Sequence, residues 1–280
     1  MLGFLLLLSQ DRFIVPPMMP RRPIAKRESL PPGTTETLTV DGKEWTLFIP
    51  DKWDRKSEAV AVHFHGAIWH AIQEHLDRGT DCPLLVFYPG EGSAIYQKSV
   101  ADSRVFDELE VVVTRRLGTK QFSTVDVTSF SAGYGAVREW VKQPRVFDRL
   151  RRVILADSLY GSLDDGKIER TPAKEHIVVW LPLAKAAMDR KKTFVITVSK
   201  VATPSYASSW ECAAAIVSAV GGRYIAVEKG TLAATLDSEF PLLSRFDSGS
   251  FHVWQYGGED AQAHMTHARH IAAIWKALDP

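Results

Sequence analysis

The chain has 280 residues, of which 45% are hydrophobic and 24% are charged, and its formal net charge is +1. This composition is typical of a folded globular protein and excludes a chain that is disordered over most of its length. Because no long run of lysine and arginine occurs, the charge pattern of a nucleic-acid binder is missing. Cys82 and Cys212 form neither a CxxC metal motif nor a disulfide framework, although a single bridge between them stays open.

The first 35 residues differ in composition from the rest of the chain. An apolar run, MLGFLLLLSQ, opens the sequence, and proline and charge dominate residues 10–35. The apolar run resembles the hydrophobic part of a signal peptide but lacks a preceding basic segment, so a cytoplasmic and an exported protein both remain open. No stretch approaches the roughly 20 apolar residues of a membrane span. We expect residues 1–35 to be a poorly ordered leader or linker with nothing to bury, and residues 36–280 to form one domain.

Apolar runs typical of buried strands alternate with segments of helical spacing after this leader. TETLTVDGKEWTLFIP predicts an antiparallel hairpin around the turn Asp41-Gly42. Further strands are predicted at AVAVHFHG, PLLVFYPG, VDVTSFSAG, RVILADS, TFVITVS and FHVWQYGG. Helices are predicted at GYGAVREWVKQP, KEHIVVWLPLAKAAMDRKK, SYASSWECAAAIVSAVGG and HMTHARHIAAIWKAL. The alternation predicts a three-layer α/β fold, with a mostly parallel central sheet, an antiparallel N-terminal hairpin and helices on both faces.

One strand is predicted to run through a tight turn into a helix. Ser131 lies at this turn, which we call the elbow, and the helix after it is the elbow helix. Small residues, Ser129 and Gly133, lie two positions before and after it. Such a turn strains its central residue and brings strand and helix so close that only small side chains fit at these two positions. Serine at 129, where the commonest form of the motif has glycine, weakens the match. The pattern predicts that Ser131 is a nucleophile, and the alternative is that it only caps the helix.

A serine nucleophile needs a histidine as general base and an acid that orients the histidine. Asp157 ends the strand after the elbow helix and is the predicted acid, with Glu211 as the second choice. His264 follows the last strand, on an expected loop ahead of the final helix, and is the predicted base. His267, further into that helix, is the alternative.

An oxyanion formed during acyl transfer needs two backbone N–H donors. Ala132 follows the serine directly, and Ala67 follows His65-Gly66 at the end of an earlier strand. We predict that the amides of Ala67 and Ala132 are these donors, with Ile68 as the alternative to Ala67.

HFHGA, SFSAG, the strand end at Asp157 and the segment around His264 together resemble the α/β-hydrolase superfamily over residues 36–280. The resemblance implies that Ser131, His264 and Asp157 hydrolyse a carboxylic ester or related acyl bond of a small molecule through an acyl-enzyme, without a metal ion or cofactor. The fold leaves the bond type, the natural substrate and the oligomeric state open.

Two segments, 90–122 and 158–175, are candidates for a lid over the site. They contain Tyr96, Phe106, Tyr160 and Leu163 among charged residues. This mixture predicts a modest acyl pocket, and hence an ester of small to medium size.

Two other functions remain open. His63 and His65 point to one face of a regular strand, and further histidines are available, so a metal-dependent hydrolase is the first alternative. A non-catalytic binding protein with the same fold is the second. Sensitivity to a chelator would favour the first, and failure of a serine-directed covalent probe would favour the second.

Overall fold

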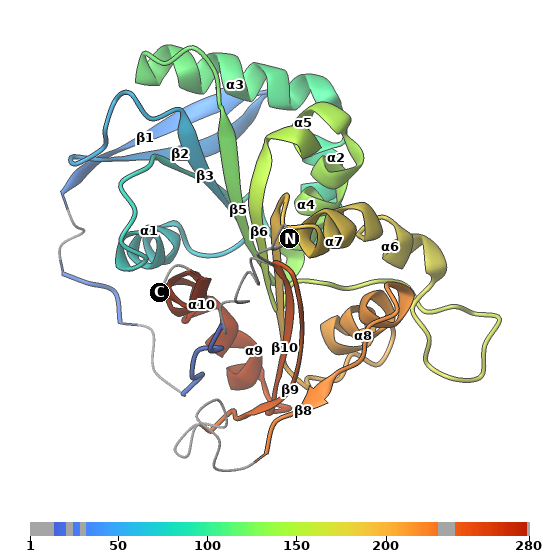
Figure 1. The fold of residues 1–280 in the computed structure, drawn as a ribbon. Coiled ribbons are helices and arrows are strands. Elements are labelled where there is room, and N and C mark those ends of the chain that lie inside the picture. Colours follow the sequence, from blue (N-terminus) through green and yellow to red (C-terminus); the bar gives the residue numbers. More distant parts are fainter. Residues whose placement is uncertain (1–13, 21–24, 29–31, 229–238, 279–280) are drawn as a thin grey trace, which may run out of the picture.

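The computed structural model of the protein describes residues 14–20, 25–28, 32–228 and 239–278 (Figure 1). The described strands form one ten-stranded sheet in the order β1-β2-β4-β3-β5-β6-β7-β10-β9-β8. Neighbouring strands are parallel from β4 to β10, and antiparallel at both ends of the sheet. The strands are β1 (Gly33–Val40), β2 (Lys43–Pro50), β3 (Ala59–Phe64), β4 (Leu84–Phe87), β5 (Thr124–Phe130), β6 (Leu150–Ala156), β7 (Thr193–Val198), β8 (Ile225–Ala226), β9 (Leu242–Ser248) and β10 (Phe251–Tyr256).

Helices cover both faces of this sheet. Figure 1 shows α1, α9 and α10 on one face and the other helices on the opposite face. The described helices are α1 (Ile68–Asp77), α2 (Ser93–Val100), α3 (Ser103–Leu117), α4 (Tyr134–Lys142), α5 (Pro144–Arg149), α6 (Lys174–Val178), α7 (Leu181–Met188), α8 (Ser209–Ala219), α9 (Ala261–Ala268) and α10 (Ile271–Leu278). The predicted three-layer architecture is confirmed.

Strand β6 shows why the central strands are apolar along their whole length. Val153 and Leu155 join the larger core on the face of α2–α8, whereas Ile154 and Ala156 join a second core with Ile274 of α10. Successive side chains of a strand point to opposite faces, and here both faces are buried. This accounts for the unbroken apolar runs in the sequence.

The predicted hairpin is also confirmed. β1 pairs with β2 from Gly33↔Pro50 to Val40↔Lys43. Asp41 and Gly42 between them have φ values of 47° and 68°. A two-residue hairpin loop with two positive φ values matches the twist of its strands, and aspartate and glycine tolerate these values.

Two predicted helices are each divided in the structure. The segment KEHIVVWLPLAKAAMDRKK forms α6 and α7, because Pro182 in the first turn of α7 has no N–H to continue the earlier helix. The final segment forms α9 and α10. There the His270 ring donates to the Thr266 carbonyl at 2.8 Å, the acceptor that the His270 amide would use in a continuous helix.

Part of the N-terminal leader packs on the domain. Met19 is fully buried in the core that contains Tyr256, whose hydroxyl donates to the Pro17 carbonyl at 2.8 Å. The expectation that the leader has nothing to bury is therefore wrong for residues 14–20, although the division of the chain near residue 35 stays a prediction. The apolar start, residues 1–13, lies outside the described residues.

None of the helices in the described part of the chain combines the length and apolar character that a membrane span requires. In the same part, Cys82 and Cys212 are free thiols and form no bridge.

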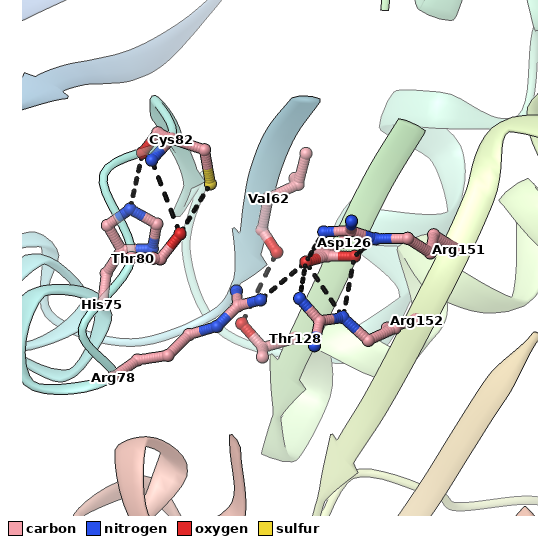
Figure 2. A network of polar contacts seen from close by, with 9 residues as sticks. All are labelled: Val62, His75, Arg78, Thr80, Cys82, Asp126, Thr128, Arg151 and Arg152. Carbon is pink, nitrogen blue, oxygen red and sulfur yellow. Dashed lines mark hydrogen bonds and ion pairs between the residues drawn. The ribbon is translucent and has the colours of Figure 1, made fainter. Parts of the chain in front are cut away.

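A buried carboxylate joins four elements at the amino-terminal edge of the parallel strands (Figure 2). Asp126 of β5 is 2% exposed and accepts hydrogen bonds from Arg78, Arg151 and Arg152, at distances down to 2.6, 2.7 and 2.9 Å. Arg78 also lies over the ring of Trp275 of α10, 3.4 Å from its centroid. Since a buried charge is tolerated only when it is paired, this network fixes α1 and α10 against β5 and β6.

Candidate active site

Ser131 lies in the tight turn between β5 and α4, within the short 3-10 turn η1 (Ser131–Gly133). Its φ is 48°, a value that non-glycine residues rarely adopt. A Cβ at Gly133 would lie 2.3 Å from the Phe64 carbonyl oxygen, because the end of β3 presses on the turn. The requirement for a small residue at 133 follows from this contact.

The serine at 129 fits because its buried hydroxyl forms a hydrogen bond with a neighbouring serine. Ser129 is fully buried, with its Oγ 2.8 Å from Ser158 Oγ, and Ser158 Oγ donates to the Ser131 carbonyl at 2.8 Å. The hydroxyl pair thus holds the backbone of Ser131. In this structure neither η1 nor α4 has a side-chain cap hydrogen bond at its start, so Ser131 does not act as the cap of the alternative interpretation.

The predicted acid and base are hydrogen bonded to each other. His264 Nδ1 donates to Asp157 Oδ2 at 2.7 Å, and the Ser199 hydroxyl donates to the same oxygen at 2.6 Å. Asp157 is 2% exposed, and burial alone would raise its pKa. The hydrogen bond from His264, the nearby ring of His267 and the Ser199 hydroxyl outweigh burial and lower the pKa of Asp157 to about 2. The carboxylate is therefore ionised at neutral pH and fixes the imidazole.

His264 belongs to the first turn of α9, which begins at Ala261, so the expectation that it lies on a loop is wrong. Asp260 caps this helix by accepting from the Ala263 amide at 2.8 Å. The Phe130 ring stacks on His264, with 4.6 Å between centroids, which leaves the imidazole beside the elbow. From the first turn of α9 the imidazole still reaches Asp157 at the edge of the sheet.

The alternative acid and base have other roles. Glu211 forms a capping box with Ser208 at the start of α8 and an ion pair with Arg170. His267 Nδ1 lies 2.8 Å from Thr197 Oγ1, and burial lowers the pKa of His267 to about 4. Both side chains thus have structural partners of their own.

The two predicted oxyanion donors come from the turn after β3 and from η1. His65 and Gly66 have φ values of 70° and 135°, and this turn leads to Ala67, the residue that precedes α1. Within the described residues, the amides of Ala67 and Ala132 donate to no backbone carbonyl. Backbone N–H groups left without an acceptor are available to a ligand.

A cavity of about 690 Å³ contains both Ser131 and His264 in its lining. Tyr134, Tyr160 and Tyr206 form an aromatic wall, with 5.6 Å between the ring centroids of Tyr160 and each of the other two. Of the residues proposed for a lid, Tyr160 lines the cavity. Tyr96 and Phe106 are instead buried in the main core, with Leu163 packed against it, so the lid expectation is wrong for these three.

The overall arrangement matches solved structures. A thermostable esterase from Pseudomonas putida ECU1011 superposes with a TM-score of 0.50 at 10% identity, over 89% of this chain and 82% of that chain. A double mutant of the esterase rPPE gives 0.51 at 10% identity over 91% and 83%. An uncharacterised protein from Capnocytophaga ochracea DSM 7271 gives 0.51 at 8% identity over 87% and 64%.

The chain has the α/β-hydrolase fold. At these identities the similarity shows the fold alone. No family model and no curated protein sequence matches the chain.

Within this α/β-hydrolase fold, the histidines considered for metal binding are engaged with protein atoms. His63 Nδ1 accepts from the Thr128 hydroxyl at 2.8 Å, and its Nε2 donates to the His65 carbonyl at 2.9 Å. Burial lowers the pKa of His63 to about 3. His65 lies beyond the end of β3 with a positive φ and contacts the Tyr96 hydroxyl at 2.8 Å, so the expectation of two imidazoles on one strand face is wrong. Among the described residues, no three histidine, cysteine or acidic side chains are grouped as metal ligands.

Three polar groups of the site were missed by the sequence interpretation. Ser158 and Ser199 support Ser131 and Asp157, and Arg138 lines the cavity. The position of Ser158 directly after Asp157 and that of Ser199 at the end of β7 were available signals, since side chains at the carboxyl ends of parallel strands meet at one edge. Arg138 gave no signal because its place depends on how α4 packs.

Proposed function

We propose that the protein is a serine hydrolase that cleaves a carboxylic ester of small to medium size through Ser131, His264 and Asp157. The observation that carries the proposal is one cavity lined by a serine in a strained turn and by a histidine whose Nδ1 is held by a buried, ionised aspartate. The esterases among the similar folds are consistent with it.

The first half of the proposed reaction forms an acyl-enzyme. Ser131 Oγ attacks the ester carbonyl carbon while His264 Nε2 takes the hydroxyl proton, and Asp157 stabilises the resulting imidazolium. The amides of Ala67 and Ala132 bind the oxyanion of the tetrahedral intermediate. The C–O bond of the ester then breaks, and the leaving alcohol takes the proton from His264.

The second half releases the acid. Water attacks the acyl carbonyl while His264 accepts one of its protons, and the same two amides bind the second oxyanion. Collapse of this intermediate returns the proton to Ser131 Oγ and frees the carboxylic acid. The cycle needs only groups of the described chain and water.

The cavity supports the proposed size of the substrate. Its volume of about 690 Å³ lies within the range of roughly 300–1,000 Å³ typical of small-molecule sites. Tyrosines offer apolar surface together with hydroxyl groups, a lining suited to a moderately polar ester.

Hydrolysis of 4-nitrophenyl butyrate by wild type and by Ser131→Ala tests the proposal, together with fluorophosphonate labelling located by mass spectrometry. Ser162→Ala is the matched control, because Ser162 lines the same cavity. We expect kcat to fall about 10⁴-fold or more in Ser131→Ala, with loss of the label, and little change in the control.

A second pair of variants tests the base. His264→Ala should lose activity as Ser131→Ala does, whereas His267→Ala should keep the label on Ser131. Folded wild-type protein with neither turnover nor label would contradict the proposal and favour the binding protein, and activity that disappears in chelator would favour a metal-dependent hydrolase.

A further inference from the structure

The cavity contains a buried guanidinium that the proposed hydrolysis does not use. Arg138 of α4 is 8% exposed and lines the cavity together with Ser131 and His264. Its Nη2 donates to Gln97 Oε1 at 3.0 Å and its Nη1 to His176 Nδ1 at 2.6 Å. Its Nε is buried without a hydrogen-bond partner.

In the described part of the chain, no carboxylate lies within ion-pair distance of the Arg138 guanidinium. Its two acceptors are a neutral amide and an imidazole, whereas the carboxylate of Asp126 is matched by three arginines elsewhere in the molecule. Buried charges are expensive unless paired, and a guanidinium has five N–H donors, of which two are used here. The remaining three donate to no group in the described part of the chain.

Arg138 is the only permanently charged side chain among the described residues that line the cavity. No aspartate or glutamate is among its described lining residues, and Asp157 lies behind His264, to which it is bonded. Because His176 Nδ1 accepts from Arg138, the ring proton of neutral His176 is on Nε2, a further donor. Burial, followed by the charge of Arg138, lowers the pKa of His176, so this ring is neutral at pH 7.

Arg138 lies one turn beyond Tyr134, the first residue of α4, and Ser131 lies three residues before Tyr134. Because Arg138 and Ser131 both line the cavity, an anion bound by Arg138 and a bond attacked by Ser131 would belong to different parts of one substrate. Tyr134, one turn earlier, has its ring 5.5 Å from the guanidinium and lines the space between.

We propose, on the basis of the hydrolase function above, that the substrate is an anionic ester with a carboxylate several bonds from the scissile carbonyl. Arg138 binds this carboxylate, and His176 donates beside it. A guanidinium fits the two oxygens of a carboxylate with two parallel N–H···O hydrogen bonds. The pocket therefore selects monoesters of dicarboxylic acids, or esters of an acidic alcohol, over neutral esters of the same length.

Two chromogenic esters with the same acyl chain separate the effect of charge from that of size. The anionic probe is the mono-4-nitrophenyl ester of pimelic acid, and the neutral probe is the same compound with its free carboxyl methylated. A butyrate ester of 4-hydroxyphenylacetate places the carboxylate on the alcohol side instead. For one of the anionic probes, we expect the kcat/KM of wild type to be about 10- to 100-fold higher than for the neutral probe. We expect Arg138→Gln to abolish this difference.

Two further variants control the experiment. Arg138→Lys should keep part of the preference, since lysine keeps the positive charge but lacks the two parallel N–H donors of the guanidinium. Lys142→Gln removes a positive charge from the exposed end of the same helix, where Lys142 pairs with Glu139, and should leave the preference as in wild type. A preference that disappears equally in Lys142→Gln would mean that only long-range charge matters and would overturn the role of Arg138.

Binding without turnover tests the inference apart from the proposed function. Monomethyl pimelate and 4-hydroxyphenylacetate are titrated into Ser131→Ala calorimetrically. We expect binding of one of them that Arg138→Gln weakens at least tenfold, whether or not wild type hydrolyses esters. Equal turnover of charged and neutral probes by wild type, together with no binding of either anion, would overturn the proposal even if Arg138→Gln fails to fold.

Discussion

Replacing Gly133 by alanine tests the packing on which the elbow depends. Gly133 has a φ of −61°, so alanine fits its backbone conformation, and in an open position the change would stabilise the fold by about 0.4–1 kcal/mol. Here the new Cβ would lie 2.3 Å from the Phe64 carbonyl oxygen and 2.8 Å from its carbon. Both contacts are with backbone, which cannot rotate away.

The clash sets the size of the effect. Contacts of this kind below 3.0 Å are essentially never seen, so η1 and the end of β3 must separate by about 0.7 Å. Overpacking usually costs about 1–3 kcal/mol, and a misplacement approaching 1 Å costs a reaction about 100-fold in rate. We therefore expect Gly133→Ala to lose about 2–3 kcal/mol of unfolding free energy and about 100-fold in kcat on 4-nitrophenyl butyrate.

Urea unfolding and ester hydrolysis are measured on Gly133→Ala and on Gly166→Ala. Gly166 lies in an exposed turn, where the nearest atom to a new Cβ is the flexible Asp164 Oδ1 at 3.3 Å. The control should match wild type in both assays. Wild-type stability and activity in Gly133→Ala would refute the close approach of β3 to the elbow.

Three further predictions concern the groups that support the fold and the site. Asp126→Asn should lower the unfolding free energy by about 3–5 kcal/mol in urea at pH 7, because Arg78, whose side chain is 6% exposed, stays buried without its counterion, and a loss under 1 kcal/mol would contradict this account. Burial holds the pKa values of His63, His75 and His267 at about 3, 4 and 4, so the unfolded chain takes up protons first as pH falls below roughly 6.5. The contribution of these histidines to the unfolding free energy should therefore be full above that pH and decline toward pH 4. His267→Gln should reduce the slope of this decline by up to about 1.4 kcal/mol per pH unit, and an unchanged slope would refute the account. Ser158→Ala should lower kcat and the rate of fluorophosphonate labelling about tenfold with little change in KM, since it frees the Ser131 carbonyl, and an equal labelling rate would show that the hydroxyl pair does not position the nucleophile.

The central sheet could be predicted because its strands are buried on both faces. Runs such as RVILADS and TFVITVS have no competing interpretation once helical segments separate them. β9 was missed because LLSRFDS mixes polar and apolar residues without clear alternation, and its pairing with β10 depends on the turn at Gly249. α1 was missed because its buried face contains histidine, glutamine and glutamate, which give no apolar stripe.

Some residues of the candidate site could likewise be predicted from the sequence, and others could not. Ser131, Asp157 and His264 lie near strand ends, so topology alone brings them to one edge of the sheet. Their assignment as a triad stays a prediction that the experiments above test. Arg138 and His176 come from two helices separated by 38 residues, and only the packing of α4 against the segment of α6 brings them together.

The backbone at the carboxyl edge of the sheet has a consequence for how this protein can change over evolution. His65, Ser131 and Asp157 directly follow β3, β5 and β6, respectively. Their φ values are 70°, 48° and 43°. Each such conformation costs on the order of 1–3 kcal/mol in a residue with a side chain. Glycine at any of the three positions would relieve that strain and remove a side chain. At Ser131 and Asp157 the side chain removed is one that the proposed hydrolysis requires, so under that proposal a stabilising change at these two positions would also abolish activity.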